Sequence, residues 1–123
     1  MPTPNFLILY VDNPLVSADF YAPLLGVKPI DAAATFALFA LDNGNKLGLW
    51  AKADVEPAAS HKGGGAEIGF PVADNAQVDA LHAAWRARGL PIVQTPVQMD
   101  FGYTFVALDP DAHRLRVFAP NAE

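Results

Sequence analysis

The sequence repeats itself, because residues 5–51 can be aligned with residues 66–119. In this alignment Leu41-Asp42 falls on Leu108-Asp109, and the segment NKLGLW falls on HRLRVF. Residues 52–65 between the copies are rich in Ala and Gly and are typical of a flexible linker. A repeat of this length restricts the fold to two similar supersecondary units. We expect both units to form one domain over residues 1–123, since the chain is too short for two ordinary domains.

Each copy shows the pattern of one strand, one helix and three further strands. The apolar runs FLILYV and AEIGFPV predict the first strand of each copy. The later strands are predicted from the runs TFALFAL, KLGLW, PIVQTPVQM, YTFVAL and RLRVF, with turns at DNGN and DPDA. The expected fold class is therefore α+β, with two βαβββ repeats that together hold two helices and eight strands, of which these runs supply seven.

The two helices are predicted from their ends and their apolar spacing. The first begins at Pro14 and ends at Gly26. Its predicted apolar stripe is Val16, Phe20 and Leu24. The second is capped by Asp74 or Asn75 and ends at Gly89, and its predicted apolar stripe is Val78, Leu81 and Trp85.

Composition excludes several classes of function. The apolar share of 52% is typical of a globular chain, and the formal net charge of −5 lacks the basic patch of a nucleic-acid binder. No apolar run reaches the roughly 18 residues of a membrane span, and the N-terminus lacks the pattern of a signal peptide. The chain has no cysteine, which excludes thiolate sites. We expect a soluble cytoplasmic protein that binds neither nucleic acid nor membrane.

The order of elements, together with VDNPLVSADFYAPLLGV and the closing LDPDAHRLRVF, resembles the vicinal oxygen chelate superfamily, the glyoxalase and bleomycin-resistance group. The resemblance implies that each repeat forms a curved half-cup of sheet whose concave face binds a ligand. In metal-dependent members, His or Glu ligands come from the first and fourth strands of each unit. The matching positions here are Asn5, Gly48, Glu67 and Arg116.

Of these four residues only Glu67 suits a divalent metal, and Arg116 would repel one. The resemblance therefore implies a metal-independent protein, and we expect no cofactor. Arg116 is expected either to compensate the charge of Glu67 in a structural ion pair or to receive an acidic group of a ligand.

Strand alternation places Trp50 on the same face as Gly48, and Phe118 on the same face as Arg116. An aromatic ring beside a glycine predicts a flat platform with room above it for a planar guest. The segments PNFLILYV, SADFY, LGLW and DPDAHRLRV resemble the phenazine-antibiotic resistance proteins of this superfamily, which sequester an aromatic drug without a metal. Trp50 matches their stacking tryptophan. The alternative is that Trp50 packs against a partner subunit.

The sequence leaves open which way the other aromatic candidates face. Phe36 and Phe39 have opposite parity on one strand, so one of them should face the ligand, and we include Phe39 among the candidates. Phe101 and Tyr103 flank Gly102 and form either a pocket rim or core. His113 follows a turn and is expected to face solvent.

These observations predict a homodimer that binds and sequesters a planar aromatic small molecule, such as a phenazine antibiotic, without a metal. The candidate ligand-binding residues are Trp50, Gly48, Glu67, Arg116, Phe118, Phe39, Phe101 and Tyr103. One alternative is a lyase, isomerase or dioxygenase of the same fold in which Glu67 holds a metal. Another is a pure interaction domain.

Overall fold

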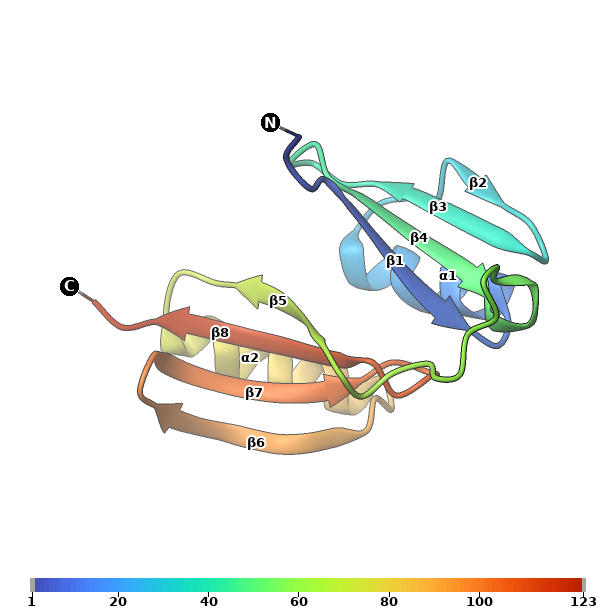
Figure 1. Cartoon of the computed structure of the whole chain (residues 1–123). Coiled ribbons are helices and arrows are strands. Elements are labelled where there is room, and N and C mark those ends of the chain that lie inside the picture. The colour runs from blue at the N-terminus through green and yellow to red at the C-terminus, as the bar shows by residue number, and fades with distance from the viewer. Residues whose placement is uncertain (1, 123) are drawn as a thin grey trace. The chain divides into compact units, whose positions relative to one another are not determined.

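A computed structural model describes residues 2–122 of the chain. The chain divides into two compact units, residues 1–63 and 64–123, which we call unit 1 and unit 2. The boundary between Gly63 and Gly64 falls inside the predicted linker. Each unit is described by itself below (Figure 1).

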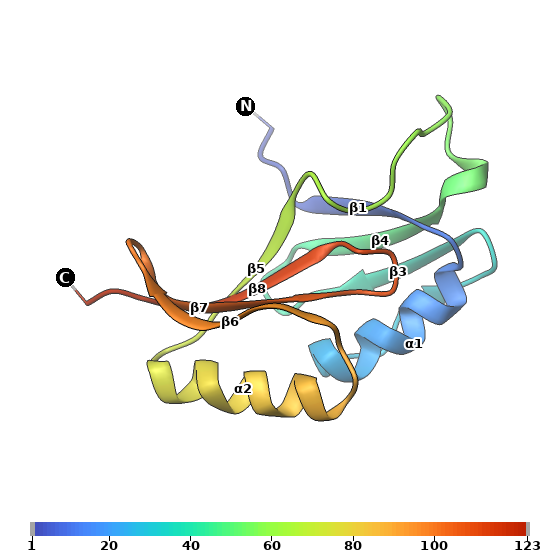
Figure 2. The ribbon, with the colours of Figure 1, turned by 90° about the horizontal axis from the view of Figure 1, so that it is seen from below.

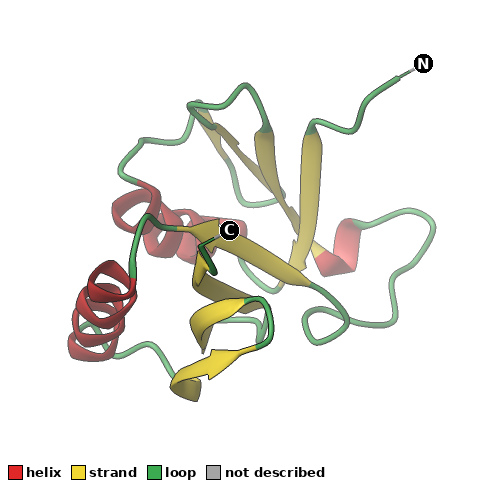
Figure 3. Cartoon of the chain, turned by 90° about the vertical axis from the view of Figure 1, so that its left-hand side faces the viewer, coloured by secondary structure: helices red, strands yellow, loops and turns green. Residues whose placement is uncertain are grey.

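Both units contain the predicted order of elements. Unit 1 consists of β1 (Phe6–Val11), α1 (Pro14–Leu25), β2 (Asp31–Ala32), β3 (Phe36–Ala40), β4 (Lys46–Ala51) and a 3-10 turn, η1 (Lys52–Asp54). Unit 2 consists of β5 (Glu67–Pro71), α2 (Asn75–Ala87), β6 (Ile92–Met99), β7 (Gly102–Leu108) and β8 (Arg114–Pro120). The prediction of two βαβββ repeats is confirmed, and Figure 3 shows the helices and strands by colour.

Each unit has one mixed sheet of four strands, in the orders β1-β4-β3-β2 and β5-β8-β7-β6. The first and fourth strands of each unit pair in parallel, and the other neighbours are antiparallel. Figure 2 shows α2 lying along one face of its sheet. We call the face covered by the helix the helix face, and the opposite one the open face. Side chains alternate between these faces along every strand.

Helix α1 begins and ends as predicted, but it buries a different stripe. The side chain of Asn13 caps it by accepting hydrogen bonds from two backbone N–H groups, and Gly26 follows it with a φ of 71°. Val16, predicted to be buried, is 52% exposed. The buried stripe contains Ser17, Ala18 and Tyr21 instead. The prediction failed because α1 is apolar almost all round, so the apolar spacing does not select one face.

Helix α2 follows the sequence prediction more closely. The side chain of Asp74 caps it by accepting a hydrogen bond from the backbone N–H of Gln77 at 2.9 Å. Val78 and Trp85 are buried, and the ring of Trp85 packs edge-on against Phe70 and Phe105 at 5.5 and 5.4 Å between centroids. These contacts form the core between α2 and its sheet.

The segment predicted to be a flexible linker begins with defined structure. Residues 52–54 form η1, and the following Val55 is buried. Further on, the ammonium of Lys62 lies 2.6 Å from a carboxylate oxygen of Asp12, next to the end of β1. The linker is therefore tied to unit 1 at both places. No helix among residues 2–122 is long and apolar enough to cross a bilayer.

The turn between β7 and β8 is held by Asp109. Its Oδ1 accepts hydrogen bonds from the backbone N–H groups of Asp111 and His113, and its Oδ2 lies 2.8 Å from Nδ1 of His113. Both side chains are buried, with His113 8% exposed. The prediction of a solvent-facing His113 is wrong, because the ring turns inward to meet the carboxylate.

Candidate functional site

The open face of unit 1 is defined by the register of its strands. Ile8 and Leu38 flank Gly48 on either side, while Tyr10 and Phe36 flank Trp50. Two residues before Ile8 on β1, Phe6 lies opposite Lys46. The side chains on this face are therefore mostly aromatic and aliphatic: Phe6, Ile8, Tyr10, Phe36, Leu38 and Trp50.

Gly48 lies at the centre of this face, and aromatic rings cover it. A Cβ built on Gly48 would lie 2.7 Å from Cζ of Phe36 and 2.9 Å from Cε1 of Phe6. The predicted room above Gly48 is therefore absent, because these two rings fill it. The glycine lets the rings lie against the strand, which makes the platform broader than a single tryptophan.

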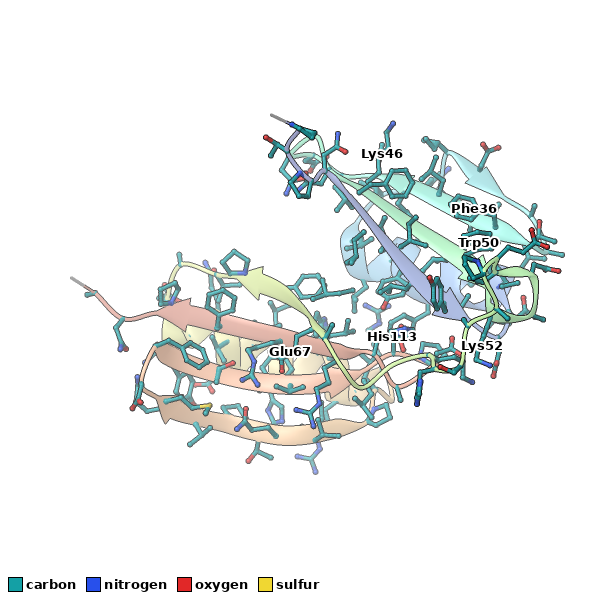
Figure 4. The ribbon with its side chains drawn as sticks, viewed as in Figure 1. Phe36, Lys46, Trp50, Lys52, Glu67 and His113 are labelled. Atoms are coloured by element: carbon teal, nitrogen blue, oxygen red, sulfur yellow. The ribbon has the colours of Figure 1, made fainter. Side chains whose placement is uncertain are left out.

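Trp50 lies on the open face, as strand alternation predicts, and is half-buried. Its ring meets the ring of Tyr10 edge-on, with 6.4 Å between the centroids. Figure 4 shows Trp50 and Phe36 close together on the neighbouring strands β4 and β3. Phe6 and Ile8 are each 44% exposed, so part of this apolar surface is accessible.

Phe39 does not belong to this surface, and its inclusion among the candidates is wrong. Phe39 lies opposite Leu47 in the sheet and is fully buried on the helix face. Phe36, three residues earlier on β3, is the phenylalanine that faces outward.

The open face of unit 2 is centred on an ion pair. Arg116 donates from Nε to Oε1 of Glu67 at 2.7 Å and from Nη2 to Oε2 at 2.9 Å. This two-point geometry is the strong form of an arginine–carboxylate pair. The hydrogen bonds from Arg116 are the largest influence on the pKa of Glu67 and lower it. Burial opposes them, and the charges of Arg116 and Arg114, which are smaller effects than burial, lower the pKa further. Glu67 is therefore ionised at neutral pH.

The remaining nitrogen of the guanidinium binds two neutral oxygens. Nη1 of Arg116 donates to Oε1 of Gln94 at 3.1 Å and to Oγ1 of Thr104 at 3.3 Å. Thr104 is fully buried and itself donates to the backbone carbonyl of Val117. Hydrogen bonds to Glu67, Gln94 and Thr104 therefore fix the position of the Arg116 guanidinium.

Aromatic rings flank the ion pair. The ring of Phe101 lies over the guanidinium, 5.7 Å from Cζ of Arg116, and meets Phe118 edge-on at 6.1 Å. A Cβ on Gly69 would lie 3.3 Å from the ring of Phe118, so this glycine also makes space for a ring. The structure brings together four candidates in unit 2: Glu67, Arg116, Phe101 and Phe118.

Tyr103 lies elsewhere, and its inclusion among the candidates is wrong. It lies opposite Ala119 on the helix face, and its hydroxyl donates a hydrogen bond to Asp79 of α2 at 2.7 Å. Phe101 and Tyr103 are separated because Phe101 lies in the turn before β7, outside the strand alternation that sets the direction of Tyr103.

The residue of unit 1 that corresponds to Glu67 lies one position after Asn5, the residue assigned from the sequence. In unit 2, Glu67 lies opposite Arg114, two residues before Arg116. The corresponding residue in unit 1 lies opposite Lys46, two residues before Gly48, and it is Phe6. The prediction of Asn5 was made without the register of β1 against β4, which places Phe6 at this position.

These residues do not fit a metal ion. Phe6 and Gly48 have no ligand atom in their side chains, and Glu67 is bound by Arg116 at both oxygens. Within residues 2–122, no three or more His, Cys, Asp or Glu side chains group so that they could hold a metal.

Sequence reasoning did not name Phe6 or Gln94, and it left Phe36 and Phe39 as alternatives. Phe6 and Phe36 lie on the face of Gly48 once the strands are paired, so the correct register would have selected them. Gln94 lies on β6 between two register shifts, which no pattern in the sequence reveals.

Comparisons with known proteins agree with this architecture. The phenazine antibiotic resistance protein EhpR of Enterobacter agglomerans is 29% identical over 118 residues, which cover 94% of this chain and 90% of the relative. A protein of Agrobacterium tumefaciens, solved in solution by NMR, is 55% identical, with a TM-score of 0.92 over 99% of this chain and 100% of that one.

A glyoxalase-related enzyme from Fulvimarina pelagi has the same fold, with a TM-score of 0.84 over 97% of this chain and 88% of that one, at 18% identity. Residues 3–117 match the sequence family described as the Glyoxalase/Bleomycin resistance protein/Dioxygenase superfamily. The two βαβββ units and this match lead to one conclusion: the chain belongs to the glyoxalase/bleomycin resistance protein/dioxygenase superfamily.

Proposed function

We propose that this protein binds a planar aromatic small molecule, such as a phenazine antibiotic, and sequesters it without a metal. The observation that carries the proposal is the open face of unit 1, where the rings of Phe6 and Phe36 cover Gly48 and Trp50 lies opposite Phe36. Such a surface binds flat apolar rings, since stacking adds roughly 0.5–1.5 kcal/mol to the burial of apolar area.

The relative EhpR supports the choice of ligand. That protein is a phenazine antibiotic resistance protein, and the match covers nearly the whole of both chains. Phenazines are flat, three-ring aromatic molecules, which suits a surface built from aromatic side chains. The identity of 29% supports the class of ligand rather than one compound.

The ion pair between Glu67 and Arg116 favours ligand binding, rather than acid–base catalysis, as the function of this protein. A general base needs a pKa near the working pH and a free lone pair directed at the substrate. Arg116 holds both oxygens of Glu67 and lowers its pKa, which makes this carboxylate a weak base. The same ion pair removes Glu67 as a ligand for a catalytic metal.

The test is calorimetric titration of the protein with phenazine, comparing the parent with Trp50→Ala. We expect phenazine to bind and the substitution to weaken affinity by about 1–3 kcal/mol through lost stacking and apolar burial. Trp50→Phe should recover part of that loss, since it restores a ring. Binding that is equal in the parent and in Trp50→Ala would contradict the proposal.

Two control variants separate binding from folding. Tyr103→Phe removes a hydroxyl that contacts α2 on the helix face, so phenazine affinity should not change. Trp85→Ala should lower the free energy of unfolding by about 3–5 kcal/mol, the usual cost of removing a buried tryptophan. The protein that stays folded should still bind phenazine with the parent affinity.

A further inference from the structure

The guanidinium of Arg116 is already occupied by the protein itself. Its Nε and Nη2 donate to Glu67, and its Nη1 donates to Gln94 and Thr104. An arginine has five N–H donors, so four of its five hydrogen bonds are made. The side chain is 18% exposed and is covered on one side by the ring of Phe101. Arg116 is therefore poorly placed to receive an acidic group of a ligand.

Glu67 is the more accessible member of the pair. Its side chain is 35% exposed, and each carboxylate oxygen accepts one hydrogen bond from Arg116. A carboxylate offers about four acceptor sites, so roughly half of its capacity remains for a ligand. Unit 2 therefore presents a carboxylate acceptor on its open face, with the 51% exposed guanidinium of Arg114 4.0 Å from Oε2 of Glu67 as a further charge beside it.

The rings beside Glu67 can orient an aromatic ligand. Phe101 is 45% exposed and meets Phe118 edge-on. A flat molecule that stacks on the exposed ring of Phe101 would lie beside the ion pair, since this ring is 5.7 Å from Cζ of Arg116. Apolar rings around an accessible carboxylate suit an aromatic ligand that carries N–H or O–H groups.

Gln94 adds a donor next to the ion pair. Because its Oε1 accepts from Arg116, the orientation of the amide is fixed and its Nε2 points toward the sulfur of Met99 at 3.6 Å. Sulfur is a weak acceptor. This N–H group can therefore exchange its partner for a ring nitrogen or carbonyl of a ligand at little cost.

We propose that Glu67, held in place by Arg116, is the specificity-determining residue, and that it selects aromatic ligands with a hydrogen-bond donor over those with a carboxylate. This inference rests on the proposed function and reverses the sequence-based alternative in which Arg116 receives an acidic group. A ligand carboxylate at the oxygens of Glu67 would meet a like charge while the guanidinium of Arg116 is engaged. Arg114 is the other cation beside Glu67, and because its side chain is 51% exposed, solvent screens its attraction for an anion.

The experiment uses three related phenazines at pH 7.5 in calorimetric titration. The probes are 2-aminophenazine, which carries a donor, unsubstituted phenazine, and phenazine-2-carboxylate, which is an anion. We expect affinity to fall in that order, with at least a tenfold difference between the amine and the carboxylate. This arm needs no variant, so it does not depend on the folding of a mutant.

A second arm uses Glu67→Gln, which keeps the shape of the side chain but releases the guanidinium. We expect the preference for the amine to fall about tenfold and the carboxylate to gain affinity. Glu56→Gln, the same change at an exposed carboxylate of the linker, should leave all three affinities unchanged.

The outcomes separate this inference from the proposed function. If the three phenazines bind, but the parent binds the carboxylate as well as the amine, the inference is wrong and the proposed function stands. If Glu67→Gln keeps the parent's preference for the amine over the carboxylate, the inference is likewise wrong and the proposed function stands. If none of the three binds, both are overturned.

Discussion

The ring of Phe36 lies directly over Gly48 on the neighbouring strand, so close that a Cβ on Gly48 would be 2.7 Å from Cζ of the ring. Real Cβ atoms do not approach a carbon atom that closely. The contact is possible because Gly48 has no side chain. The same glycine lets the ring of Phe6 approach from the other side. Gly48 therefore determines how closely both rings lie against strand β4.

Gly48→Ala should therefore weaken ligand binding more than it weakens the fold. The clashing atoms are the outer ends of rings that are partly exposed, so the rings can swing aside. We expect a loss of about 1 kcal/mol in the free energy of unfolding, at the lower end of the cost of overpacking. Phenazine affinity should fall several-fold, because the displaced rings no longer form one surface. Urea unfolding and calorimetric titration measure the two effects.

Gly65→Ala is the matched control for this substitution. A Cβ at Gly65 meets no atom within 4 Å, so neither stability nor affinity should change. Equal phenazine affinity in Gly48→Ala and the parent would show that the rings around Gly48 do not contact the ligand.

The ion pair of unit 2 should make stability depend on acid pH. Hydrogen bonds from Arg116 hold the pKa of Glu67 below its ordinary value of 4.5 in the folded protein. The pair therefore contributes its full stability above pH 4.5, and this contribution is lost as the pH falls through the folded-state pKa. Glu67→Gln should flatten the dependence of the urea midpoint on pH in this acid range.

Arg114→Gln offers a comparison for the acid titration. Its guanidinium lies 4.0 Å from Oε2 of Glu67, and its charge is the smallest contribution to the lowered pKa. We expect this variant to keep most of the pH dependence. A profile as flat as that of Glu67→Gln would mean that Arg116 is not the main partner.

Asp109 should be required for the stability of unit 2. Its carboxylate accepts from two backbone N–H groups and contacts the ring of His113 in a buried turn. Asp109→Ala should lower the free energy of unfolding by about 2–4 kcal/mol, since buried donors lose their acceptor. Asp109→Asn keeps one acceptor oxygen and should cost less. The order of the two urea midpoints tests this account.

The edge of the first sheet predicts self-association. Strand β1 lies at that edge, and Phe6, Leu7 and Ile8 are each more than 40% exposed along it. Exposed apolar edge strands are usually covered by another chain or blocked by charge. We expect a homodimer, detected by light scattering as a species of twice the 13.1 kDa of one chain. A monomer at micromolar concentration would contradict this.

Most of the fold could be predicted from the sequence because the determining signals are local. Asn13 and Gly26 mark the ends of α1, and alternation along β4 correctly placed Trp50 on the open face. The two-residue strand β2 was not located, because two residues carry no periodic pattern.

The site could be predicted only in part because it depends on pairing between strands. Phe36 and Phe39 are equivalent in sequence terms, and only the contact of Phe39 with the helix face distinguishes them. The position of Phe6 required the true register of β1 against β4. The bonds from Arg116 to Gln94 and Thr104 join three strands, and no sequence pattern predicts such a network.

The matching registers of the two units constrain how such a chain can diverge. At equivalent positions, unit 1 has Phe6 with Gly48, and unit 2 has Glu67 with Arg116. Replacing Glu67 alone leaves the charge of Arg116 without its counter-ion, and enlarging Gly48 alone collides with the rings above it. Each position therefore tolerates change mainly when its partner changes too. We therefore expect a sequence that keeps this backbone to change the two residues of each couple together rather than one at a time.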